Sequence, residues 1–238
     1  MALGQLTYLQ LTNATLRRLG KAQVVSADFA GLAADTWGGL VKDFLNDAQR
    51  EVYKEHDWST LITLYTISAI SDRTYNLSTS VSDFGREIDL TSTTNDQVLE
   101  PTTLRTIDTL DPDLDDSASP LRYHIAYPNL LFDRTPSSET FRLRYVKRPA
   151  VLSAVTAVSD LPEYCDMVLV WYAYWQLQAT REDATDGGEV ARSIYENTLA
   201  RAIGQDRRRM DRVWSLQPIW PTRIREVVPF PPAYDTDR

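Results

Sequence analysis

The chain has 238 residues, of which 43% are hydrophobic and 10% aromatic, so it can bury a sizeable core. Charged residues make up 24%, and no apolar run approaches the roughly 20 residues that cross a bilayer, which excludes a membrane-spanning protein. The net charge of −8 excludes a protein that holds nucleic acid through its overall field, because phosphate binding needs a basic surface.

The first segment, MALGQLTYLQLTN, lacks the basic and apolar regions of a secretory signal. We therefore expect the protein to act where it is made, or inside something assembled there. Its one cysteine, Cys165, cannot form an internal disulfide or a thiolate metal site, and we expect it to be a small buried side chain.

Two helices are predicted in the first quarter of the chain. Residues 6–19 carry leucines near helical spacing, and Gly20 follows where a helix would stop. A loop is expected over Lys21–Asp35. Apolar residues then recur three and four apart within Trp37–Asp57, behind the capping candidates Asp35 and Thr36, which predicts a strong amphipathic helix.

Between Trp58 and Pro149 the hydrophobic period changes to two, which is typical of strands. The clearest run alternates apolar with cationic residues, namely Phe141, Leu143 and Tyr145 with Arg142, Arg144 and Lys147. Turn residues separate the runs at 83–85, 95–96, 127–129 and 136–138. The middle of the chain is therefore predicted to be a β-rich module.

The chain returns to helix at Asp160, where Asp160 and Glu163 have the spacing of a capping box and Pro162 lies in the first turn. This helix contains the block DMVLVWYAYWQL, residues 166–177, which is apolar on almost every side. After Gly187 and Gly188, a second apolar stripe predicts that another helix completes a hairpin.

These patterns predict an α+β fold with three parts. An α-helical bundle core of about four helices is expected from residues 1–58 and 160–213, and a β-rich insertion module from 59–150. Residues 214–238 contain five prolines among large hydrophobics, so we expect an extended C-terminal docking arm on another protein or on its own domain. Its candidate docking residues are Trp214, Trp220, Val227, Phe230 and Tyr234.

A helix that is apolar all round must be surrounded. Either the other predicted helices cover the block in an intramolecular bundle, or part of it reaches a neighbouring subunit. Tyrosine and tryptophan suit protein interfaces because their polar tips find partners there. The core or interface candidates are Trp171, Tyr172, Trp175 and Gln178.

No motif for chemistry stands out, so we predict a protein that is not an enzyme and has no catalytic, cofactor or metal site. GxxxxGK[ST], GxGxxG and GxSxG are absent, and His56 and His124 belong to no catalytic or zinc motif. The run from Asp111 to Asp115 begins like a calcium loop but lacks its glycine and glutamate, which leaves a solvated acidic loop or an opportunistic cation site. The paired carboxylates that cleave glycosides come together only in the folded protein, so the sequence does not identify such a pair.

One basic cluster occurs near the end of the last predicted helix. It is either a solvated helix end, whose cations complement the helix dipole, or an electrostatic contact with an acidic partner or with passing DNA. Its members are Arg207, Arg208, Arg209 and Arg212.

The order of these elements resembles the head-to-tail adaptor, or connector, proteins of tailed bacteriophages. The segments that carry the resemblance are FLNDAQREVYKEHDW, FRLRYVKRPAVL and LPEYCDMVLVWYAYWQLQ. The resemblance spans roughly residues 5–205. The β-insertion and the C-terminal arm are larger than in the smallest members of that family.

The resemblance implies a structural virion protein at the head-tail junction, made in the host cytoplasm. Such proteins form a ring, commonly of twelve copies, that binds the portal protein through a C-terminal arm and receives the tail or nozzle protein on its far side. Double-stranded DNA passes through the channel without specific binding. The alternatives are a tail nozzle or tail-completion protein, or a virion-associated cell-wall glycosidase.

Overall fold

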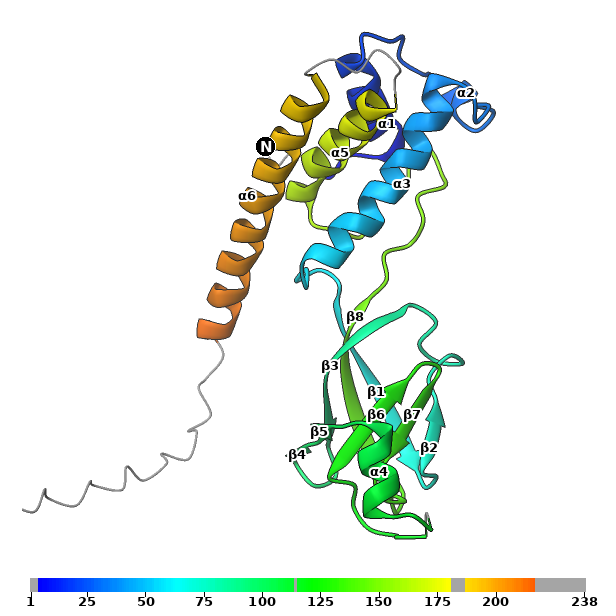
Figure 1. Ribbon diagram of the computed structural model, residues 1–238, viewed down its shortest axis with the longest axis vertical. Helices are drawn as coiled ribbons and strands as arrows, with labels where there is room; N and C mark the ends of the chain where they lie inside the picture. Colours follow the sequence, from blue (N-terminus) through cyan, green and yellow to red (C-terminus); the bar gives the residue numbers. More distant parts are fainter. Residues whose placement is uncertain (1–3, 114, 181–186, 217–238) are drawn as a thin grey trace, which may run out of the picture.

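The computed structural model describes residues 4–113, 115–180 and 187–216, with side chains as far as Met210 in the last helix. Helices gather at one end of an elongated molecule and strands at the other (Figure 1). In chain order the elements are α1 (Tyr8–Arg18), α2 (Ser26–Phe29), α3 (Trp37–Glu55), β1 (Ile62–Ile70), β2 (Thr74–Asn76), β3 (Phe84–Ser92), β4 (Gln97–Val98), β5 (Glu100–Pro101), α4 (Leu104–Leu110), β6 (Arg122–Ala126), β7 (Asn129–Phe132), β8 (Glu139–Lys147), a 3-10 turn (Glu163–Cys165), α5 (Asp166–Ala179) and α6 (Gly187–Leu216).

The two N-terminal helices form where the sequence pattern predicts them. Thr7 and Gln10 make a capping box at the start of α1, and the Thr36 side chain accepts a hydrogen bond from the backbone of Gly39 at the start of α3. The loop expected over Lys21–Asp35 contains a helical turn, α2, that the sequence analysis did not predict. It places the buried Phe29 ring against Tyr8, with 5.1 Å between the ring centroids.

The prediction of a capping box at Asp160 is wrong. Helix α5 begins at Asp166, after the 3-10 turn, and Asp160 caps neither of them. Its carboxylate instead accepts hydrogen bonds from Lys147 Nζ at 3.1 Å and from the backbone N–H of Ala150 at 2.8 Å. Asp160 therefore holds the chain where it leaves β8.

Helix α5 contacts α1, α3 and α6. Its fully buried apolar side chains are Val168, Leu169, Val170, Ala173 and Leu177. They belong to a hydrophobic cluster that joins all four of these helices and also includes Trp58, Leu61 and Val146 from the start and end of the β part.

The strands form two four-stranded sheets with the orders β1-β8-β3-β4 and β2-β7-β6-β5. A second hydrophobic cluster contains side chains from both sheets, such as Phe141 of β8 and Phe132 of β7, whose ring centroids are 4.7 Å apart. The alternation predicted along β8 is confirmed, since Phe141, Leu143 and Tyr145 are buried. Helix α4 was not predicted, and it buries Ile107. Helices and sheets together confirm the α+β class.

The chain enters and leaves the β part at neighbouring positions. The backbone N–H of Lys147 donates to Leu61 O at 2.9 Å, and that of Arg148 donates to Asp83 O at 2.6 Å. Trp58 anchors the entry because its buried indole donates to Val52 O at 2.8 Å. The segment that enters the β part and the segment that leaves it therefore run side by side next to the helices.

Helix α6 continues to Leu216 and extends well beyond the level at which α5 begins (Figure 1). The extended arm was expected to begin at Trp214, but residues 214–216 belong to this helix. The helix continues because residues 204–216 contain no proline, and the first one follows at Pro218. The other docking candidates of the arm, Trp220, Val227, Phe230 and Tyr234, lie outside the described residues.

Candidate functional site

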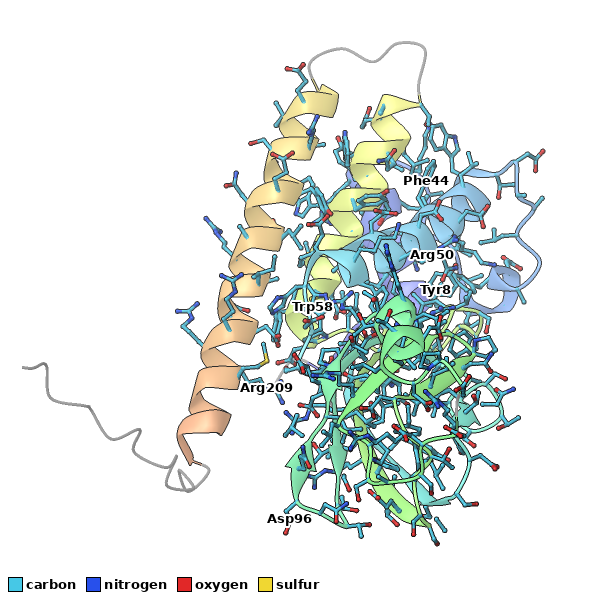
Figure 2. The ribbon with its side chains drawn as sticks, turned by 60° about the horizontal axis from the view of Figure 1, so that its bottom comes forward. Tyr8, Phe44, Arg50, Trp58, Asp96 and Arg209 are labelled. Atoms are coloured by element: carbon cyan, nitrogen blue, oxygen red, sulfur yellow. The ribbon has the colours of Figure 1, made fainter. Side chains whose placement is uncertain are left out.

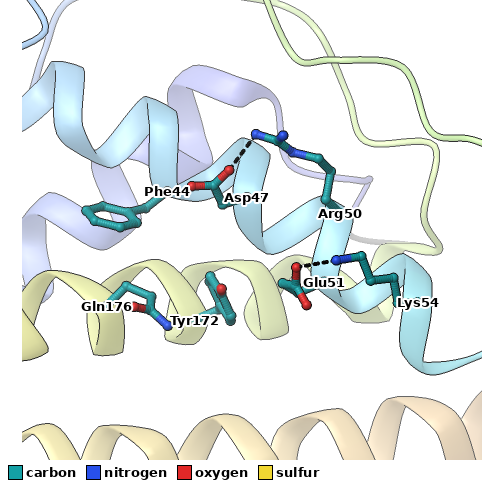
Figure 3. A pocket seen from close by; sticks show the side chains of 7 residues that line it. All are labelled: Phe44, Asp47, Arg50, Glu51, Lys54, Tyr172 and Gln176. Atoms are coloured by element: carbon teal, nitrogen blue, oxygen red, sulfur yellow. Dashed lines mark hydrogen bonds and ion pairs between the residues drawn. The ribbon is translucent and has the colours of Figure 1, made fainter.

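A groove runs along α3, α5 and α6. Its first part has a volume of about 280 Å³ and is lined by Phe44, Asp47, Arg50, Glu51, Lys54, Tyr172 and Gln176 (Figure 3). Its second part has a volume of about 400 Å³ and is lined by Glu51, Glu55, Tyr172, Trp175, Arg192, Tyr195, Glu196 and Leu199. The two parts share Glu51 and Tyr172 and together carry four carboxylates and three cations, and we call them the acidic groove.

Aromatic rings form the floor of the acidic groove. Tyr172 packs edge-on against Trp175 and Tyr195, with centroids 5.6 and 5.3 Å apart, and Trp175 stacks on Tyr195 at 5.8 Å. Tyr172 and Trp175 are only half-buried. The helices of one chain therefore leave part of this aromatic surface open.

The four core or interface candidates behave alike. Trp171, Tyr172, Trp175 and Gln178 are all half-buried, whereas the aliphatic residues of α5 are fully buried. Trp171 lies outside the groove, where the Arg18 guanidinium stacks over its ring at 4.7 Å. The block of apolar residues is thus covered on its aliphatic face and incompletely covered on its aromatic face.

Carboxylates line the α3 wall of the groove. Asp47, Glu51 and Glu55 recur every four residues, so they lie on one face of the helix. Asp47 pairs with Arg50 at 2.5 Å and Glu51 pairs with Lys54 at 2.6 Å (Figure 3). Both pairs are exposed, so each contributes little to stability.

The carboxylates affect the tyrosines of the groove floor. Burial raises the pKa of Tyr195 to about 12, with a further contribution from Glu55. Burial, Glu51 and Asp47 likewise raise the pKa of Tyr172. Both phenols therefore resist ionisation even above the ordinary tyrosine pKa of about 10.

A buried carboxylate fixes α6 to the rest of the molecule. Asp206 is 0% exposed and accepts hydrogen bonds from the Ser59 backbone N–H at 3.0 Å, from Ser59 Oγ at 2.6 Å and from the Tyr164 hydroxyl. His56 Nε2 lies 3.1 Å from the same carboxylate. Burial and Asp206 raise the pKa of Tyr164, which keeps that hydroxyl protonated. Four groups from two segments, 56–59 and the 3-10 turn, thus meet at one residue of α6.

The basic cluster begins just after Asp206. Arg207, Arg208 and Arg209 are exposed, and the Arg208 Nε donates to Gly204 O at 3.0 Å. Figure 2 shows Arg209 on the part of α6 that continues beyond the other helices. Successive residues of a helix point about 100° apart, so these three side chains do not share a face. The side chain of Arg212 lies outside the described residues.

The fold buries Cys165 and gives hydrogen-bond partners to His124 and Asp111. Cys165 is 0% exposed, and burial raises the pKa of its thiol above the ordinary range. His124 Nδ1 lies 2.9 Å from Thr102 O. Asp111 receives hydrogen bonds from Arg73 and from the Asp116 backbone, so its carboxylate is already occupied.

No three His, Cys, Asp or Glu side chains lie close enough to hold a metal ion within the described residues. A search of the same residues finds no helix that is both long and apolar enough to cross a membrane.

Sequence reasoning missed the partners that the fold assembles around α6. Asp206 lies about 150 positions from His56 and Ser59, and Glu196 shares a groove with Glu55 only because α3 and α6 both pack against α5. The polar segment QDRRRMDR gave no sign that its aspartate is buried.

Half-buried aromatic side chains are typical of surfaces that bind other proteins, and exposed charges help to select the partner. The class of protein that these surfaces fit is one that binds other proteins. The sequence matches the family described as SU10 adaptor protein over residues 6–221, and the chain belongs to this family. The family confirms the expected phage adaptor and implies a component of the virion. No curated protein matches the sequence.

Proposed function

We propose that the protein is a head-to-tail adaptor that forms a ring beneath the portal, joins it to the tail or nozzle protein, and extends the channel for DNA. The family match over residues 6–221 carries the proposal. The incompletely covered aromatic face of α5 supports it, because such a surface becomes fully buried when a neighbouring copy packs against it. Twelve copies are expected from the resemblance stated above.

The three parts of the chain have separate roles in this proposal. The helical core, 1–58 and 160–213, is a four-helix bundle that makes the subunit contacts through Tyr172, Trp175 and Gln178. The β-rich module, 59–150, contacts a neighbouring virion protein. The C-terminal segment docks on the portal, and α6 supports this role because it carries the chain away from the core before that segment begins.

The net charge of −8 supports passage of DNA without specific binding. A channel wall of net negative charge repels the phosphates, so the duplex can pass without being held.

The test is to mix the purified protein with purified portal rings of the same phage and to measure the mass of the complex by light scattering. We expect one adaptor copy for every portal subunit. A variant that lacks residues 217–238 is the matched partner, because it keeps α6 intact, and it should fold but not join the portal. Failure of the full chain to bind would contradict the proposal and would favour a distal tail component, the nozzle or completion protein.

A further inference from the structure

The outer side of α6 carries two arginines that share one face. The side chains that α6 turns inward are Ala191, Tyr195, Leu199, Ala202 and Asp206. Arg201 and Arg208 are exposed and lie seven residues apart, which is almost two full turns, so both point away from that buried stripe. Arg201 was not part of the cluster that the sequence indicated.

Gly204 lies between these two arginines on the same outward side. A Cβ atom added to it would meet no other atom within 4 Å, so nothing within the described chain requires a glycine there. Glycine is unfavourable in the middle of a helix, and it permits close approach of another surface to the backbone. We call Arg201, Gly204 and Arg208 the arginine face.

The acidic groove has the chemistry that an arginine face needs. Glu51, Glu55 and Glu196 supply carboxylates at its walls, and Tyr172 and Trp175 supply aromatic faces at its floor. Glu51 pairs with Lys54 and Glu196 pairs with Arg192 through exposed ion pairs, which an incoming guanidinium can join or replace. Guanidinium groups stack on aromatic rings as well as pairing with carboxylates. The chain already uses this contact once within the groove, where Arg192 lies over Trp175 at 5.7 Å.

We propose that the arginine face of one copy docks into the acidic groove of the next copy. The two surfaces differ, so the contact is head-to-tail and generates a closed ring or an open helix, not a two-fold dimer. The spacings agree, because Arg201 and Arg208 are about 10.5 Å apart along their helix and Asp47 and Glu55 about 12 Å apart along theirs. This inference rests on the proposed ring and names the surfaces that form it.

The test is an exchange of charge between the two surfaces. The groove variant carries Glu55→Lys and Glu196→Lys, and the face variant carries Arg201→Glu and Arg208→Glu. All four side chains are exposed, so the folds should persist, which thermal unfolding checks. A control variant with Arg105→Glu and Asp108→Lys changes exposed charges on α4 instead.

Ring formation is measured by light scattering with and without portal rings. Each swapped variant alone should lose at least about tenfold in self-association, because like charges meet at every contact. An equal mixture should recover the ring, since each basic surface then meets an acidic one. Both variants keep a negative net charge, so bulk attraction between them does not explain recovery.

The outcomes separate this inference from the proposed function. If both variants assemble as well as the control, or if mixing restores nothing, the arginine face does not dock in the groove, while the ring itself stands. If the unaltered chain neither self-associates nor joins the portal, the proposed function fails, and this inference fails with it. A Gly204→Trp variant gives a second measurement, because it should fold normally and block assembly, and normal assembly would contradict the docking.

Discussion

Replacing Asp206 with alanine should remove the main polar anchor of α6. The carboxylate is 0% exposed and serves both donors of Ser59 and the hydroxyl of Tyr164, with His56 as a fourth neighbour. Each buried donor left without an acceptor costs about 1–3 kcal/mol. Ser59 and Tyr164 are only half-buried, so water satisfies part of this demand. We therefore expect a loss of about 3 kcal/mol in the free energy of unfolding, at the lower end of the range for breaking a buried charged network.

Urea denaturation at neutral pH measures that loss. Tyr164→Phe removes a single hydrogen bond and should cost about 1 kcal/mol. Glu196→Ala, on the exposed side of the same helix, is the matched control and should stay within about 0.5 kcal/mol of the unaltered chain. Hydrogen exchange should also quicken in α6 beyond Ala202. A loss below about 1 kcal/mol for Asp206→Ala would refute the idea that this residue anchors the helix.

Three further outcomes follow from the structure. Burial raises the pKa of Asp166 to about 6, so ionising this carboxyl disfavours the folded state. The contribution of the protonated carboxyl to the free energy of unfolding is therefore full below about pH 4 and is lost as the pH rises through 6. Asp166→Asn should therefore remove about 2–3 kcal/mol of pH dependence between about pH 4 and 7.5, and urea denaturation at both pH values checks this. Trp171→Ala should lower the free energy of unfolding by about 2 kcal/mol, because Trp171 is half-buried and a fully buried aromatic costs about 3–5 kcal/mol. A loss above about 4 kcal/mol would place Trp171 in the core. Gly39→Ala should destabilise the protein by about 2 kcal/mol, because the added Cβ would lie 2.1 Å from a backbone oxygen. Gly204→Ala should stabilise it by about 0.5–1 kcal/mol, because a Cβ there meets no other atom. Equal effects of the two changes in thermal melts would contradict this contrast.

Local patterns predicted those elements whose physical cause is local. Thr36 and the apolar spacing after it identify α3, and the alternation along β8 identifies a strand with one buried face. The turn at Asn95 and Asp96 joins β3 to β4, and Asp96 adopts a φ of 51°, a conformation that aspartate tolerates better than most residues. Each of these signals needs only a few neighbouring residues.

Elements whose cause lies far along the chain were not predictable in this way. The capping-box spacing at Asp160 is genuine in the sequence, but Lys147 and Ala150 compete for the same carboxylate in the fold. The buried role of Asp206 depends on Ser59, 147 positions away. Charge patterns grouped Arg207, Arg208 and Arg209, whereas helix geometry pairs Arg208 with Arg201.

The β part is an insertion whose first and last residues lie next to each other, beside the helical part. The hydrogen bond between Lys147 and Leu61 closes the helical part whatever the length of chain in between. Insertions or deletions within the β part therefore need not shift α3 or α5, so its outer loops can vary while the helices keep their packing. One chain thus combines a helical part of fixed packing with a β part whose loops can be exchanged.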